Sequence, residues 1–280
     1  MKKSILIAIV FLSQLTMAQS PWVAEKGNGF FQLGGSFIGP YNTLFTDQNE
    51  DFITSRNLTD LTFQIYGEYG LGKGWETFFA LPFVIQTSGE LSENPSLNPT
   101  IERGNHSALG NIEWGIKKVL YNKELIVSAA IRTEVKTSSF DEATGLRSGY
   151  GAWGIAPSIM VGQGTDRFYA FLSTGPTLRS DGYSSEWRIQ AEGGYKLGSN
   201  SYVMLNIFIV ESFRNGEVEL PNSNLETGFF VNNQSFFSFG PKLLTQFTDH
   251  IGLTGAVYFA ASGNQVAKSP SVNLGVFKKF

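Results

Sequence analysis

Several stretches of the chain alternate strictly between apolar and polar residues. The pattern is clearest over residues 125–136, where one set of alternate positions is apolar and the other carries most of the charge. The apolar set is Leu125, Val127, Ala129, Ile131, Thr133 and Val135, and the polar set includes Ser128, Arg132, Glu134 and Lys136. A period of two is that of a β-strand with one apolar and one polar face, whereas an amphipathic helix repeats every three to four residues. Residues 60–71, 75–87 and 186–197 alternate in the same way, so the pattern predicts an all-β protein.

About twelve such segments follow one another along the chain. They lie near residues 28–38, 59–71, 75–87, 107–119, 124–137, 151–162, 167–178, 185–197, 201–212, 229–244, 250–261 and 271–280. Most are longer than the strands of globular proteins, which have about 5–6 residues. A tilted strand that crosses a bilayer needs about 9–11 residues. The segment lengths therefore predict a transmembrane antiparallel up-and-down β-barrel of about 12 strands.

The connections between these segments alternate between short and long. The short ones lie at 72–74, 121–123, 162–166, 198–200 and 245–249, and the long polar ones at 39–58, 88–106, 138–150, 179–184, 213–228 and 262–270. Outer-membrane barrels have tight periplasmic turns and longer external loops. A soluble β-sandwich has no reason to keep this alternation, so the connections favour a barrel in the cell outer membrane.

The N-terminus has the features of a cleaved export signal. A short basic segment precedes an apolar run from Ile5 to Leu15, and small residues around Thr16 and Ala18 form a cleavage site before Gln19. The apolar run is too short for a transmembrane helix, which needs about 20 residues. We therefore expect residues 1–18 to be a signal peptide and residues 19–280 to form the outer-membrane barrel.

Composition and charge exclude several classes of protein. The chain has no cysteine, which removes disulfides, zinc ribbons, iron–sulfur clusters and thiol nucleophiles. Its two histidines, His106 and His250, leave little for a histidine metal site. The net charge of −3 gives no reason to expect binding to nucleic acid. We predict no metal and no cofactor.

Aromatic residues cluster beside the short turns, and four prolines fall inside the predicted strands. The aromatic residues are Tyr69, Trp75, Tyr121, Phe168, Tyr195, Tyr202 and Phe247. Rings at this level match the interfacial girdle of a membrane barrel. The prolines are Pro82, Pro157, Pro176 and Pro241. Because proline cannot donate to a β-ladder, we expect either bulges at these positions or strand boundaries that differ from the predicted ones.

Three parts of the chain resemble known exported barrels. The alternating segment 271–280, which ends in Phe280, resembles the C-terminal signal that outer-membrane proteins present to the barrel-assembly machinery. Residues 107–115 resemble the Ser-Gly-Leu-Gly-Asp-Ile pattern of the phenol-degradation MetA-type barrel family, which is loosely related to FadL-like hydrocarbon transporters, although Asn111 stands where that family usually has Asp. Residues 80–83 resemble the strand–Pro–aromatic segment of the same family. The resemblance implies an outer-membrane channel for small, often hydrophobic compounds.

The polar faces of the predicted strands supply candidate lumen-lining residues. They are Glu68, Glu76, Glu113, Lys117, Arg132, Glu134, Lys136, Arg188, Glu192 and Lys196. On a lumen wall such charges select permeants. Alternatively, they pair with one another and fill a narrow barrel, because twelve strands lie between the filled 8-stranded and the open 16-stranded cases. The sequence leaves both interpretations open.

These observations predict an outer-membrane channel for passive passage of small molecules, hydrophobic or aromatic ones among them, surrounded by outer-membrane lipid. One alternative is a non-conducting barrel whose external loops bind a partner. Another is a lipid-modifying enzyme, suggested by His106 and Ser107. Neighbouring strand residues point to opposite faces, so these two side chains are badly placed for a catalytic pair, and we predict that the protein is not an enzyme.

Overall fold

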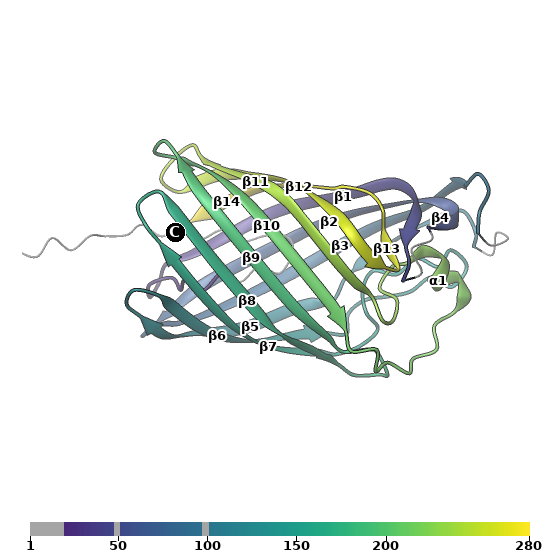
Figure 1. The fold of residues 1–280 in the computed structure, drawn as a ribbon, viewed down its shortest axis with the longest axis horizontal. Coiled ribbons are helices and arrows are strands. Elements are labelled where there is room, and N and C mark those ends of the chain that lie inside the picture. Colours follow the sequence, from purple (N-terminus) through teal and green to yellow (C-terminus); the bar gives the residue numbers. More distant parts are fainter. Residues whose placement is uncertain (1–19, 48–50, 97–100) are drawn as a thin grey trace, which may run out of the picture.

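The computed structural model describes residues 20–47, 51–96 and 101–280, and these residues form a closed β-barrel (Figure 1). The strands are β1 (Gly29–Phe45), β2 (Phe52–Gly72), β3 (Trp75–Leu91), β4 (Gly104–Leu109), β5 (Ile112–Asn122), β6 (Ile126–Val135), β7 (Gly154–Gly164), β8 (Phe168–Arg179), β9 (Glu186–Leu197), β10 (Ser201–Ser212), β11 (Ser235–Gln246), β12 (Ile251–Asn264), β13 (Val266–Ala267) and β14 (Ser271–Lys279). The expected signal peptide, residues 1–18, lies outside the described residues.

The described residues contain fourteen β-segments, but the wall of the barrel has only twelve strands. β4 and β5 both pair with β3 and together make one interrupted wall strand, and β13 only adds two residues beside β1. All neighbours are antiparallel, and β1 closes the barrel by pairing with both β2 and β14. The predicted all-β, up-and-down barrel of about twelve strands is confirmed.

Short and long connections lie at opposite ends of the barrel, as the sequence predicts (Figure 1). We call the short-turn end periplasmic and the long-loop end external, by the rule for outer-membrane barrels. The two longest described loops, 136–153 and 213–234, are both external, and the second contains α1 (Asn222–Thr227). No helix of the described chain is long and apolar enough to cross a membrane.

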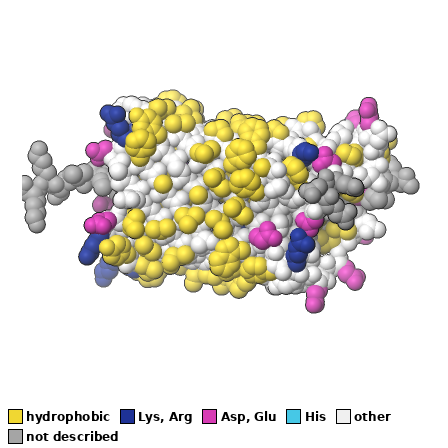
Figure 2. Space-filling model, in the orientation of Figure 1, with side chains coloured by type: hydrophobic (Ala, Val, Ile, Leu, Met, Phe, Trp, Pro, Cys, Tyr) yellow, Lys and Arg dark blue, Asp and Glu magenta, His cyan; other side chains and the backbone are white. Residues whose placement is uncertain are grey.

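The outer surface of the wall is a broad apolar band. Side chains of alternate residues face outward, so that Ile131 in β6 is 49% exposed while its neighbour Arg132 is buried on the inner face. Figure 2 shows apolar side chains over the middle of the barrel and charged ones gathered towards its two ends. This is the distribution expected of a wall that contacts lipid.

The aromatic girdle is present at the periplasmic end, with one exception. The rings of Tyr69, Trp75, Tyr121, Phe168 and Phe247 are exposed there, and Tyr195 packs against Phe168 with ring centroids 4.7 Å apart. The prediction was wrong for Tyr202, which is buried on the inner face among other lumen side chains. Its position beside a short turn does not reveal its face, because the face depends on strand parity.

Several strand boundaries differ from the predicted ones. β11 begins at Ser235 rather than near 229, because the preceding residues fold into α1 and two turns. The predicted segment 107–119 is interrupted between Leu109 and Ile112. β1 and β2 extend beyond the predicted ends, and β2 has 21 residues, which is longer than a bilayer crossing requires.

All four prolines lie at breaks in a ladder. The pairing of β3 is broken opposite Pro82, where β4 ends and β5 begins. The β7–β8 pairing is broken around Pro157 and Pro176, and the β11–β12 pairing around Pro241. Because the backbone of Gly175 approaches Pro157 so closely that a Cβ there would lie 2.1 Å from the Pro157 carbonyl oxygen, only glycine fits opposite that break. Of the two expectations, ladder irregularities at the prolines are confirmed.

Candidate functional site

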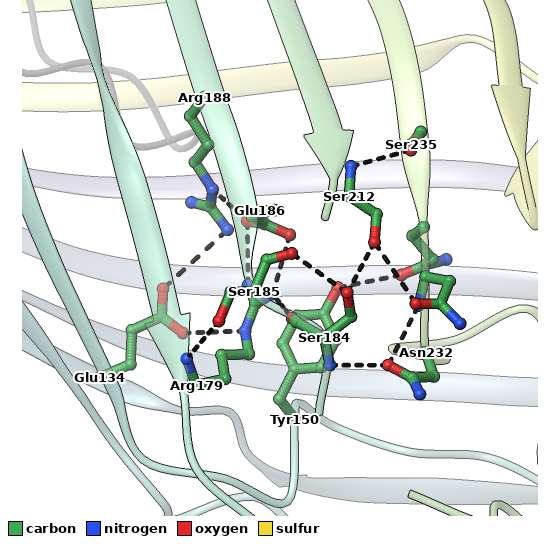
Figure 3. Close-up of polar contacts among 12 residues, drawn as sticks. Glu134, Tyr150, Arg179, Ser184, Ser185, Glu186, Arg188, Ser212, Asn232 and Ser235 are labelled. Atoms are coloured by element: carbon green, nitrogen blue, oxygen red, sulfur yellow. Dashed lines mark hydrogen bonds and ion pairs between the residues drawn. The ribbon is translucent and has the colours of Figure 1, made fainter. Parts of the chain in front are cut away.

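The external half of the barrel interior holds a network of six charged side chains. They come from β5, β6, β8 and β9, and are Glu113, Arg132, Glu134, Arg179, Glu186 and Arg188. Each lies on the inward parity of its strand, and Figure 3 shows four of them converging from β6, β8 and β9. Three arginines face three glutamates, so the network carries no net charge.

The closest contacts in this network are made around Arg179. Its guanidinium group donates to both carboxylate oxygens of Glu186, at 2.8 and 3.0 Å, and its Nε lies 3.7 Å from Glu134. Arg188 also donates to Glu186 and lies 3.9 Å from Glu134. Glu134 is on β6 and Arg188 on β9, so their side chains reach across two intervening strands. Bidentate contacts such as that between Arg179 and Glu186 hold both side chains in fixed positions.

Arg132 extends the network towards β5. It lies 3.1 Å from Glu134 and 3.6 Å from Glu113. The side chains of Arg132 and Glu134 are both more than nine-tenths buried. A buried charge that lost its partner would be strongly destabilising, so these groups form one interdependent unit that occupies the interior at this level.

Tyr150, from external loop 136–153, covers this network. Its ring centroid lies 3.8 Å from the guanidinium carbon of Arg179, and its hydroxyl donates to Gln234 of the other long loop at 3.1 Å. Burial raises the pKa of Tyr150 to about 12. The hydroxyl therefore stays neutral and remains a hydrogen-bond donor at physiological pH.

The two long loops fold into the external mouth of the barrel. Arg147 of loop 136–153 donates from its backbone to Gln86 in β3 at 2.9 Å and from its side chain to Tyr183 at 2.7 Å. Glu226 in α1 accepts a hydrogen bond from Ser55 in β2 at 2.6 Å. Beneath these loops lies an apolar cluster formed by Tyr41, Leu44, Leu58, Ile101, Leu146 and Phe229. The two long loops thus narrow the external mouth of the barrel.

The periplasmic half of the interior contains a second set of buried charges. Lys117 in β5 lies 2.7 Å from Glu76 in β3, and both side chains are fully buried. Glu68 accepts a hydrogen bond from Tyr66 at 2.6 Å. On the opposite wall, Glu192 accepts a hydrogen bond from Tyr169 at 2.7 Å and lies 3.8 Å from Lys242.

An N-terminal segment runs inside the barrel at this level. We call residues 20–24 the N-terminal strap. Lys117 donates to the carbonyl oxygen of Ser20 at 3.0 Å, Ser128 to that of Pro21 at 2.5 Å, and the backbone N–H of Ala24 to Glu76 at 2.7 Å. These bonds join backbone atoms of the strap to side chains of β3, β5 and β6.

Trp22 anchors the strap by packing. Its ring is 6% exposed and makes edge contacts with Tyr169 and Phe171 of β8, at centroid distances of 5.7 and 5.9 Å. The strap thus contacts one continuous sector of the inner wall, from β3 to β8. Around it lies an apolar layer of buried inward side chains, formed by Phe30, Tyr66, Phe78, Ala80, Ala130, Met160, Tyr202, Met204, Leu244 and Phe277.

The predicted lumen residues fall into two groups of four, with one further lysine at each end of the barrel. Glu113, Arg132, Glu134 and Arg188 form the external network, and Glu68, Glu76, Lys117 and Glu192 lie in the periplasmic half. Lys196 is half-buried at the periplasmic end, with its ammonium 5.9 Å from the ring centroid of Tyr202. Lys136 lies one residue beyond β6, half-exposed at the external rim, where it is 3.4 Å from Asp181.

Sequence reasoning missed the strap and the partners Arg179, Glu186 and Lys242. Arg179 falls one residue beyond its predicted strand, and Lys242 follows a proline in an irregular segment. Glu186 shares the parity of Arg188 and could have been included on that ground. The strap has no alternating pattern that would signal its position.

The histidine of the hydrolase hypothesis has a different partner from the expected one. His106 lies 3.0 Å from the hydroxyl oxygen of Ser139, at the exposed external surface. The nearby carboxylate of Asp141 is used to accept hydrogen bonds from the backbone and side chain of Thr144, at 2.9 and 2.8 Å. These bonds lower the pKa of Asp141. A triad needs a third group that orients the base, and Asp141 is committed to Thr144.

The fold matches solved outer-membrane proteins. An outer-membrane channel from Pseudomonas putida F1 is 13% identical and superposes with a TM-score of 0.72, covering 94% of this chain and 99% of that chain. The NanC porin is 7% identical, with a TM-score of 0.55 over 89% of this chain and all of its own. The translocator domain of the autotransporter NalP from Neisseria meningitidis is 11% identical, with a TM-score of 0.52 over 92% of this chain and 90% of that domain.

These likenesses define the class of protein: the chain has the fold of an outer-membrane β-barrel of the porin-like type. No family model and no curated protein matches the sequence. The resemblance to the phenol-degradation MetA-type family therefore stays a prediction.

Proposed function

We propose that the protein is an outer-membrane channel through which small molecules pass passively, and that the described structure is its closed state. The observation that carries the proposal is the way the strap is held. Residues 20–24 are bonded to side chains of the wall and lie outside its β-ladder. The strap can therefore leave the lumen without breaking the barrel, and its departure would uncover the periplasmic half of the lumen.

The lining of this path favours small hydrophobic or aromatic permeants. Aromatic and aliphatic side chains form the layer around the strap, including Phe30, Phe78 and Phe277. The external network has no net charge, so it offers no strong preference for ions of one sign. We therefore assign lumen-lining roles to the predicted inward residues, except Lys136, and propose that apolar surface and width decide which molecules pass.

Liposome swelling with a panel of uncharged solutes tests this function directly. We expect vesicles that contain the protein to admit small aromatic solutes faster than sugars of similar size. Vesicles that contain the barrel of an unrelated non-conducting protein provide the control. If no solute enters, even after the strap is removed, the channel function is wrong.

A non-conducting barrel is the second candidate, and the paired charges favour it. Arg132, Glu134 and Arg179 fill part of the interior as a cluster of paired charges. In that case the external loops would be the functional surface. Planar-bilayer conductance separates the two candidates. The lipid-modifying alternative predicts phospholipid turnover, which hydrolysis assays on the purified protein measure.

Export and location give a direct prediction. We expect cell fractionation to recover the protein in the outer membrane, and N-terminal sequencing of the mature chain to begin at Gln19, because residues 1–18 have the features of a signal peptide. Recovery from soluble periplasm without detergent would contradict the membrane assignment.

Phe280 provides a second prediction, which concerns assembly. Its backbone exchanges two hydrogen bonds with Gly29, at 2.9 and 3.1 Å, and its ring stacks on Tyr69 at the seam between the first and last strands. We expect Phe280→Glu to lower the amount of folded protein in the outer membrane several-fold while export continues, because the change alters the proposed signal to the barrel-assembly machinery. Heat-modifiable migration of membrane fractions on gels measures the folded amount.

Phe247→Glu is the matched control for this prediction. Phe247 is also an exposed aromatic residue at the periplasmic end, but it lies in the β11–β12 turn. We expect its replacement to leave the folded amount nearly unchanged. Equal losses in both variants would show that Phe280 acts only as a rim aromatic residue.

A further inference from the structure

A cluster of lysines lies beside two exposed aromatic rings at the periplasmic end. We call Lys73, Lys118 and Lys123 the lysine patch. Lys73 is in the β2–β3 turn, Lys118 is near the end of β5, and Lys123 is in the β5–β6 turn. Because β3 pairs with β5, with Trp75 opposite Lys118, these two turns lie side by side.

The ammonium groups of the patch are held at the level of the aromatic girdle. Lys118 Nζ lies 4.9 Å from the ring centroid of Trp75 and donates to the backbone carbonyl of Lys73 at 2.5 Å. Lys123 Nζ lies 6.0 Å from the ring centroid of Tyr121. Contacts of this kind attract a cation to the face of an aromatic ring. They fix two positive charges beside rings that are 41% and 46% exposed on the outside of the wall.

These charges are not neutralised by ion pairs. In the part of the chain that the structure describes, no carboxylate lies within 4.0 Å of any of the three ammonium groups. The acidic residue nearest in sequence is Glu124, which is exposed in the β5–β6 turn. What distinguishes the patch is that residues of two adjacent turns and of β5 bring three lysines together, whereas the β7–β8 turn has a single basic residue, Arg167, next to Asp166.

We propose that the lysine patch binds the headgroup of an anionic phospholipid, such as phosphatidylglycerol, in the leaflet that faces the periplasm. The patch attracts the phosphate, while Trp75 and Tyr121 lie at the depth of the glycerol and upper acyl chains. Lys118 and Trp75 belong to the outward parity of their strands, which also carries Trp114 and Phe83, so the site opens towards lipid. A cell-wall polymer would approach from the periplasm and reach the turn residues Lys73 and Lys123, whereas Lys118 beside Trp75 faces the lipid. The proposal rests on the outer-membrane location but not on conduction through the lumen.

Native mass spectrometry of the full mature chain tests the proposal. The protein is released from micelles doped with equal amounts of phosphatidylglycerol and phosphatidylcholine, and the bound lipids are counted. We expect the wild type to retain phosphatidylglycerol preferentially. Lys118→Gln/Lys123→Gln should reduce this retention roughly tenfold, since each surface lysine contributes a several-fold preference for anionic lipid. Lys118→Arg/Lys123→Arg should keep it.

Arg167→Gln/Lys278→Gln is the matched control, because it removes the same charge from two separate places on the periplasmic rim, the β7–β8 turn and the end of β14, where the side chains are exposed. We expect it to reduce retention less than twofold. Heat-modifiable migration confirms that each variant is folded. Equal losses in both double variants would mean diffuse attraction and would overturn the site. Unchanged phosphatidylglycerol retention in Lys118→Gln/Lys123→Gln, with loss of co-sedimentation with purified peptidoglycan, would assign the patch to the cell wall instead.

Discussion

Deleting residues 20–24 from the mature chain is expected to raise single-channel conductance in planar bilayers several-fold. The strap contacts β3, β5 and β6 through hydrogen bonds and β8 through the ring of Trp22, so it occupies the lumen along one continuous sector of the wall. Its removal leaves Glu76 and Lys117 still paired with each other, at 2.7 Å, and it leaves every strand of the wall intact. Swelling assays on the same variant should show faster entry of small solutes. An unchanged conductance would mean that the external loops or the charged network close the lumen by themselves.

A reversible cross-link supplies the control for this deletion. The chain has no cysteine, so Pro21→Cys/Gly162→Cys introduces the only pair, at positions where a Cβ on Gly162 would lie 2.6 Å from Pro21 Cγ and the two side chains therefore face each other. We expect the oxidised variant to stay closed and the reduced one to conduct as the wild type does. Each single-cysteine variant should be insensitive to reductant. Conduction through the oxidised, cross-linked variant would show that permeants bypass the strap.

The sequence predicts the wall better than the contents of the lumen, and the reason is physical. Strand identity and the direction of each side chain follow from a period of two, which is local. For that reason Ile131 and Arg132 can be assigned to opposite faces from the sequence alone. Partners inside the barrel depend on how strands far apart in the chain face one another across the interior. Glu134 and Arg188 meet across two strands, and no local pattern specifies that meeting.

The position of the strap is even harder to predict from local sequence patterns. Residues 20–24 carry no alternation, and Trp22 in a short polar and apolar segment gives no sign that it is buried. Its position is decided by hydrogen-bond acceptors and donors that project from β3, β5 and β6.

The aromatic residues beside the short turns are predicted in part from the sequence. Closeness to a turn correctly predicted the girdle position of Trp75 and wrongly predicted that of Tyr202, because turn proximity sets depth while parity sets the face.

The second prediction compares arginine substitutions on the outer and inner faces of the wall, which we expect to change the free energy of unfolding by different amounts. Ala129 in β6 faces outward between Val127 and Ile131, so Ala129→Arg would place a charge in the lipid near the middle of the strand. We expect this variant to lose about 2–4 kcal/mol of unfolding free energy. Urea titration of the protein in lipid vesicles, followed by tryptophan fluorescence, measures the loss. Ala129→Leu is the control for side-chain size and should be close to the wild type.

The arginine on the inner face must be placed where the lumen can accommodate a large side chain. Parity alone suggests Ala130, but its side chain is 4% exposed within the apolar layer and lies opposite Lys117 in register. An arginine there would overpack the interior and repel Lys117, which costs about 1–3 kcal/mol for the packing alone. Ser173 in β8 is the better site, since it is inward-facing and only partly buried, opposite Gln190. We expect Ser173→Arg to cost less than half of what Ala129→Arg costs, because polar neighbours and water can solvate its charge. A stable Ala129→Arg beside an unfolded Ser173→Arg would mean that the two faces are exchanged, and the charged residues could then not line a channel.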